Sequence, residues 1–354
     1  MWARTANHPH MAPVKPPEIA YGSDKNGLVW AYRFSPGAPP RELDSESVAG
    51  WLAAPTDADG AGFAWLHFSL SNTGAERWLR QSLQLPDSFY ESLRESVGST
   101  RLEQAGDSLV AVIHDVMFDA SFDSSSVSTV TLGVTPRLVI SARLRPLRSV
   151  DRLRAAVRAG QVFRSTAELL AHLLRDQAEV LVQIVRQSTT RVDGIEDRLL
   201  ANRVSVSRSE LSTLRRTLVR LQRLLAPEPA ALFRLLSKPA GWVKDEDQRD
   251  LRQAAEEFSE AVTDATALAE RVKLLQEELI AQVNEQTGNT LFVLTVVTVL
   301  ALPINLIAGL FGMNVGGIPF SQVPHGFVVV VGGTILLTAT LAYLTYRLLN
   351  RHRN

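Results

Sequence analysis

The sequence contains no cysteine among its 354 residues, which excludes disulfide bonds, thiolate metal sites and cysteine nucleophiles. It has no P-loop and no Gly-x-Gly-x-x-Gly, Gly-x-Ser-x-Gly or His-Glu-x-x-His motif. We therefore expect neither an enzyme nor a nucleotide-driven pump. Net charge is also absent, since 37 Lys and Arg balance 37 Asp and Glu. This balance gives no indication of a nucleic-acid partner.

Charged residues are also missing from one long stretch near the C-terminus. No Asp, Glu, Lys or Arg occurs from Gln286 to Tyr346. Two segments in this stretch, 290–311 and 327–346, are long and apolar enough to cross a bilayer as helices. The alternative, a buried hairpin of a soluble protein, is disfavoured because such helices normally carry a polar face.

The orientation of these spans follows from the basic residues around them. The tail 347–354 contains Arg347, Arg351 and Arg353, whereas the loop 312–326 contains no Lys or Arg. Positive residues favour the cytoplasmic side. Two spans return the chain to its starting side, so we expect both termini in the cytoplasm and the loop outside.

The part before the spans is predicted to be largely cytoplasmic and folded. Residues 1–20 are proline-rich without a continuous apolar run, which indicates a disordered lead-in and not a signal peptide. Residues 21–160 mix β-rich runs with helical stretches and are predicted to form an α/β domain. The expected strands are 28–34, 63–70, 108–118, 127–135 and 137–143. Residues 161–289 are predicted to be helical.

The last of these helices is unusually long. Apolar residues recur in steps of four and three from Leu251 to Val283, which predicts packing against other helices. No proline interrupts the pattern before the membrane, so the helix is predicted to run from about 245 to about 311. It would be a stalk that continues into the first span. Twelve acids and four bases occur in 245–285, and several copies around an axis would attract cations.

One face of the first span carries its polar and small residues, together with two leucines. Its members, three or four residues apart, are Leu291, Thr295, Thr298, Leu302, Asn305, Gly309 and Gly312. Polar groups within a membrane need protein or water as partners. Two interpretations stay open: close helix packing through small residues, or a pore face whose oxygens replace water on a passing ion. A pore requires an oligomer, since two spans cannot enclose one.

The first span ends in Gly312-Met313-Asn314, preceded by LPINLIAGLF and followed by VGGIP. Placed after a long stalk helix and before a second span and a basic tail, this motif resembles the CorA family of divalent-cation transporters, and more narrowly its ZntB zinc-transporter branch. The resemblance implies an α+β membrane protein of the bacterial inner membrane, assembled as a homopentamer with a funnel-shaped cytoplasmic domain. The first span would line the pore.

The resemblance also implies roles for single residues. Asn314 would hold a hydrated cation at the outer mouth. Thr295, Thr298, Asn305 and Gly309 would face the pore, with Leu291 and Leu302 as its constrictions. No cofactor is implied beyond the transported cation, and no nucleotide or nucleic acid.

The loop departs from the magnesium-type pattern because it contains no acid. This departure argues against the magnesium branch. The resemblance to the ZntB branch implies zinc uptake, with cadmium, nickel or cobalt as further cations and proton coupling left open. His325 is the loop's one good zinc ligand type, although a lone loop histidine is more often merely solvated. Glu277, Glu278 and Glu285 are candidates for attracting cations below the membrane. The alternatives are a magnesium or cobalt channel of the same fold and a membrane-anchored ligand-binding scaffold.

Overall fold

The computed structural model describes residues 22–53, 62–94, 99–117, 127–201, 208–313, 316–319 and 324–352. The chain divides into two compact units, Met1–Leu274 and Leu275–Asn354. The strands are β1 (Leu28–Phe34), β2 (Arg41–Leu43), β3 (Phe63–Ser69), β4 (Arg101–Ala105), β5 (Ser108–Val116), β6 (Val127–Val134) and β7 (Leu138–Arg143). The helices are α1 (Ser45–Ala53), α2 (Gly74–Ser82), α3 (Asp87–Arg94), α4 (Arg148–Arg158), α5 (Thr166–Leu200), α6 (Arg208–Leu225), α7 (Pro227–Leu236), α8 (Asp245–Phe311) and α9 (Gly326–His352).

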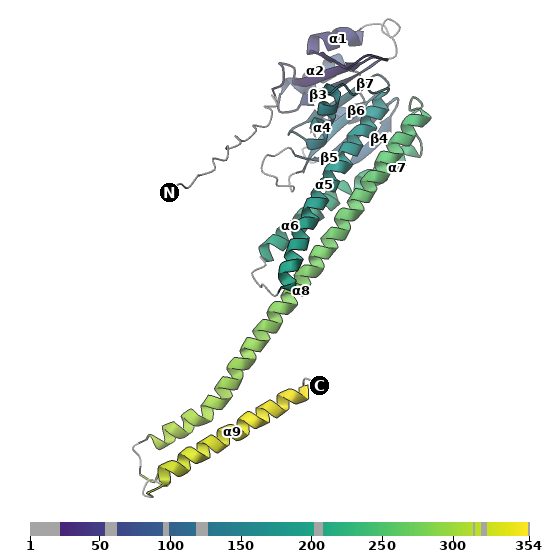
Figure 1. Cartoon of the computed structure of the whole chain (residues 1–354). Coiled ribbons are helices and arrows are strands. Elements are labelled where there is room, and N and C mark those ends of the chain that lie inside the picture. Colours follow the sequence, from purple (N-terminus) through teal and green to yellow (C-terminus); the bar gives the residue numbers. More distant parts are fainter. Residues whose placement is uncertain are drawn as a thin grey trace, which may run out of the picture. The chain divides into compact units, whose positions relative to one another are not determined.

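The first unit is built on one mixed sheet with the strand order β2-β1-β3-β7-β6-β5-β4 (Figure 1). β3 and β7 pair in parallel, and the other neighbouring strands are antiparallel. All seven residues of β3 are buried. A mostly apolar strand that is buried along its whole length is typical of a sheet covered on both faces, and the predicted α/β class is confirmed.

Helices cover the two faces of the sheet separately. Trp65 of β3 packs in a cluster with residues of α4, α5, α7 and the start of α8. Its neighbour Leu66 packs in a second cluster with residues of α1, α2 and α3. Successive residues of a strand point to opposite faces, so the alternation along β3 creates a three-layer core.

α8 is one helix of 67 residues from Asp245 to Phe311, as predicted. Its apolar stripe is buried at most positions from Leu251 to Leu279, whereas Val283 is 43% exposed. The packing of this buried stripe stabilises the N-terminal half of α8.

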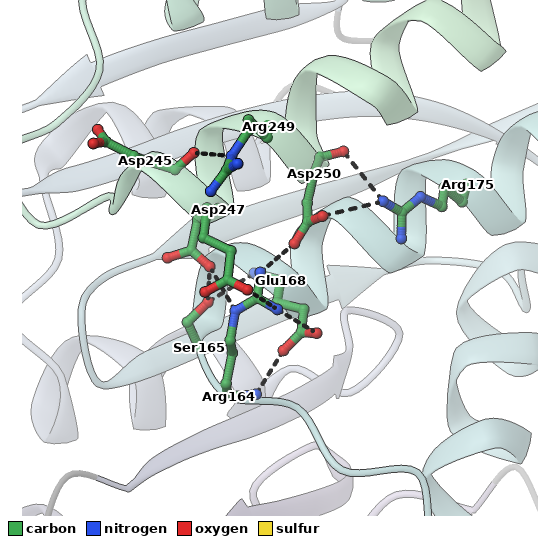
Figure 2. Close-up of polar contacts among 9 residues, drawn as sticks. Arg164, Ser165, Glu168, Arg175, Asp245, Asp247, Arg249 and Asp250 are labelled. Atoms are coloured by element: carbon green, nitrogen blue, oxygen red, sulfur yellow. Dashed lines mark hydrogen bonds and ion pairs between the residues drawn. The ribbon is translucent and has the colours of Figure 1, made fainter.

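The start of α8 is held by charges on the segment before α5 (Figure 2). The guanidinium of Arg164 lies 3.4 Å from the carboxylate of Glu246 and 3.5 Å from that of Asp247, and it also pairs with Asp250. The hydroxyl of Ser165 donates to the Asp247 carboxylate at 2.7 Å. Asp247 is buried, so these contacts fix the N-terminal end of the long helix to α5.

The second unit contains the end of α8 and all of α9. Both helices are long and apolar enough to cross a membrane. They contain the two predicted spans, 290–311 and 327–346.

Candidate ion-conduction site

The polar line of the first span lies on one face of α8. Thr295, Thr298, Asn305 and Gly309 are all exposed in the single chain. The two leucines of the line are also exposed, Leu291 by 58% and Leu302 by 64%. Residues three and four apart in a helix share a face, so the structure brings the line together as predicted.

The two threonines present their oxygens in a defined way. The Thr295 hydroxyl donates to the Leu291 carbonyl and the Thr298 hydroxyl to the Leu294 carbonyl, each at 2.8 Å. A hydroxyl has one hydrogen and two lone pairs. Each threonine therefore satisfies its donor within the helix and keeps acceptor capacity for a group outside it.

α9 lies along a different face of α8. A groove of about 1140 Å³ separates the two helices, and its α8 side is formed by Ile304, Ile307, Ala308, Phe311 and Gly312. At about 100° per residue, the polar line is centred roughly 140° around the helix from the middle of this wall. Gly312, at the end of the line, reaches the edge of the groove. The rest of the line is exposed and does not line this groove.

The turn after α8 contains the motif that carried the family resemblance. The backbone N–H of Gly312 donates to the Ala308 carbonyl at 2.9 Å, which closes the helix. A Cβ at Gly312 would lie 3.0 Å from that carbonyl oxygen. The Met313 side chain is 50% exposed. Asn314 lies outside the described residues, so its place at the outer mouth stays a prediction.

The remaining predicted site residues are exposed and separate. His325 is exposed, and its carbonyl accepts a hydrogen bond from the Val329 N–H in the first turn of α9. Glu277, Glu278 and Glu285 are exposed on α8. Within the described part of the chain, no group of three or more His, Asp or Glu side chains is placed to hold a metal ion.

His67 of the first unit has a structural role. His67 is fully buried and stacks on Trp30 with ring centroids 4.0 Å apart. Its two ring nitrogens bond Ser141 at 2.7 Å and Arg143 at 2.9 Å. Burial and the nearby Arg143 charge lower the pKa of His67 well below its usual value, so the ring is neutral and accepts from the arginine.

Sequence reasoning missed a group of buried carboxyls between the sheet and its helices. Asp115 of β5 accepts from the backbone N–H and hydroxyl of Ser149 at 3.0 and 2.7 Å. Glu228 of α7 accepts from the His114 backbone at 2.6 Å. Burial raises the pKa of Asp115 and of Asp176 on α5 to about 7. The one sequence signal was the charged Asp115 within a mostly apolar strand.

Three comparisons with known proteins give the same result. The model of the CorA-like Mg²⁺ transporter protein family matches residues 60–347. The divalent cation transporter CmaX of Pseudomonas aeruginosa is 28% identical over 314 residues, which is 87% of this chain and 92% of that protein. The zinc transport protein ZntB of Pectobacterium atrosepticum is 24% identical over 276 residues, 76% of this chain and 84% of that protein.

The solved structure of full-length CmaX has the same fold. It matches 94% of this chain and 99% of its own, with a TM-score of 0.77 and 25% identity. The resemblance inferred from Gly-Met-Asn and its setting is thus confirmed, and the family is one of transporters and not of enzymes. The chain belongs to the CorA-like family and is a divalent-cation transporter of the CorA and ZntB type.

Proposed function

We propose that the chain assembles as a homopentamer in a bacterial inner membrane and imports zinc through a central pore lined by α8. The observation that carries this proposal is the polar line on the face of α8 turned away from α9. Exposed threonine and asparagine oxygens are costly against lipid. A pore between copies gives them water and a passing cation instead.

In this proposal the residues along the conduction path have distinct roles. Asn314 holds a hydrated cation at the outer mouth, because neutral amide oxygens suit a cation that keeps its water. Thr295, Thr298, Asn305 and Gly309 line the path, and Leu291 and Leu302 form its apolar constrictions. Glu277, Glu278 and Glu285 concentrate cations at the inner end. Both termini lie in the cytoplasm, as the basic tail favours.

Zinc is preferred to magnesium on two grounds. Relatives that cover most of the chain are named zinc transport proteins. The loop 312–326 contains no carboxylate, the ligand type that magnesium favours. The second candidate is a magnesium channel of the same fold, which the description of the matching family favours.

Metal uptake into proteoliposomes tests the proposal. We expect Zn²⁺ to enter faster than Mg²⁺, and an inward proton gradient that increases zinc uptake would establish coupling. Magnesium entry that follows its own gradient and ignores pH would favour the second candidate. No metal entry by intact protein would contradict both.

The same assay tests the pore motif. We expect Asn314→Ala to lower Zn²⁺ uptake at least tenfold with the oligomer intact, because the ring of amide oxygens is lost. Gln322→Ala removes an amide from the same loop outside the motif and serves as the matched control. Equal uptake by the two variants would exclude Asn314 from the conduction path.

A further inference from the structure

α6 presents an arginine-rich face. Between Leu211 and Leu225 the helix has four arginines and no acid. Its buried face is leucine, and Arg216, Arg220 and Arg223 lie on the opposite, exposed face. Val219 lies among them and is 44% exposed. This set of Arg216, Val219, Arg220 and Arg223 is the basic face.

α8 presents the opposite charge at another place. Between Gln253 and Glu270 it has five acids and no base. Glu256, Glu260 and Asp264 are exposed on the side of the helix that faces away from the buried Ala265. This set of Glu256, Glu260 and Asp264 is the acidic face.

The two faces do not neutralise one another within the chain. Arg220 and Arg223 form no ion pair with any described residue, and the Arg216 guanidinium donates to a carbonyl of its own helix. The carboxylates of the acidic face likewise form no ion pair in the described part of the chain. Both faces are thus left for a partner.

The packing of the helices explains this separation. α5 joins each of the other two helices by charges on a different side: its Arg198 lies 3.3 Å from Glu210 of α6, and its Asp193 lies 2.8 Å from Arg271 of α8. On a helix, residues 193 and 198 point roughly 140° apart. Since α6 and α8 each bury the face opposite their charges, the basic and acidic faces open to different sides.

We propose that the basic face of α6 binds the acidic face of α8 in a second copy of this chain. A twofold-symmetric dimer would place like charges together, whereas a head-to-tail contact pairs opposite charges. Head-to-tail contacts that close form a ring. The inference rests on the pentamer proposed above. It identifies an interface that joins each subunit to the next one in the ring. Glu277, Glu278 and Glu285 lie outside this interface and stay available for cations.

Cysteine cross-linking tests the contact without background, because the chain has no cysteine. In the full-length protein, Arg220→Cys with Glu260→Cys should give an oxidised ladder that extends to the complete ring on a denaturing gel. Neither single variant should cross-link, since each cysteine faces a different side of its neighbour. Arg158→Cys with Glu260→Cys uses an exposed arginine of α4 and is the matched control.

Charge exchange gives a second, independent readout. Reversing the basic face (Arg216→Glu, Arg220→Glu) should lower the oligomer fraction in detergent at least fivefold at low salt. Adding Glu256→Arg and Glu260→Arg in the same chain should restore it. An intact wild-type pentamer with no ladder and no effect of reversal would overturn the interface while leaving the transport function untouched. Reversal that spares assembly but lowers uptake in phosphatidylglycerol vesicles alone would also overturn it, in favour of a lipid contact.

Discussion

Asp176 of α5 is a residue at which burial and charge conflict. One of its carboxylate oxygens is buried without a hydrogen bond. The imidazole of His172, whose pKa is lowered by burial, lies 3.7 Å away on the same helix, and the guanidinium of Arg152 of α4 lies 3.8 Å away. Burial raises the pKa of Asp176 to about 7, the Arg152 charge opposes this, and Glu179 and Asp115 add to it. The carboxyl is therefore half ionised near neutral pH.

This conflict predicts how stability depends on pH. In the unfolded chain Asp176 ionises near pH 4, and in the folded chain near pH 7, so the free energy of unfolding falls as pH rises between these values. We expect Asp176→Asn to increase the free energy of unfolding by about 2 kcal/mol or more at pH 8 and by less at pH 5. Chemical denaturation at several pH values measures this.

Asp197→Asn is the control for that experiment, because Asp197 is exposed on the same helix. It should change stability little at any pH. A destabilising effect of Asp176→Asn at pH 8 would mean that the carboxylate is held by its arginine more strongly than burial penalises it.

At the scale of elements, the contact between the start of α5 and the start of α8 is the clearest case of local sequence setting a long-range contact. Ser165 accepts a hydrogen bond from the Glu168 N–H at 3.0 Å and so caps α5. Glu168 accepts in return from the Arg164 N–H. The Ser-x-x-Glu capping pattern is visible in the sequence. It positions Arg164 for the acids of α8.

We expect Arg164→Ala to loosen this contact. Asp247 would remain buried with the Ser165 hydroxyl as its donor. The Arg164 side chain is 40% exposed, so solvent screening reduces the loss to about 1–2 kcal/mol in the free energy of unfolding. Thermal unfolding and protease cleavage near residue 245 would report it. Arg158→Ala, an exposed arginine of α4, should leave both unchanged.

The elements that sequence patterns predicted are those with strong periodicity. The five expected strands match β1, β3, β5, β6 and β7 to within two residues. β2 and β4 were missed, and they are the two edge strands of the sheet. Their sequences are REL and RLEQA, and charged residues of this kind protect edge strands from further pairing. Because these charges interrupt the apolar run that predicts a strand, the two edge strands could not be recognised from the sequence. The long helix was predicted because its apolar stripe and lack of an early proline are unambiguous.

At the scale of the whole molecule, the orientation of the chain in the membrane can be tested with introduced cysteines. With both termini in the cytoplasm, Ser321→Cys in the loop should react with an impermeant maleimide on intact cells. Ser237→Cys, exposed after α7, should react only after the membrane is opened. The reverse pattern would invert the proposed topology.

The candidate site was predictable in part, for a physical reason. Helical spacing places Thr295, Thr298 and Asn305 on one face, and the structure has them there. The charge match between α6 and α8 was not predicted, because it depends on which side of each helix is buried. Tertiary packing decides which side is buried, and the number of acids and bases along the chain does not reveal it.

The hydrogen bonding of the two threonines has a consequence for anions. Thr295 and Thr298 donate their hydroxyl hydrogens to carbonyls of their own helix. Chloride or phosphate needs donors to replace its water, and along this face only the Asn305 amide has N–H groups to offer. In the proposed pentamer, five such faces around the pore would bind cations and exclude anions. Discrimination against anions would then come from the helix backbone, whose carbonyls accept the hydrogen bonds of the threonine hydroxyls, without any fixed charge in the membrane.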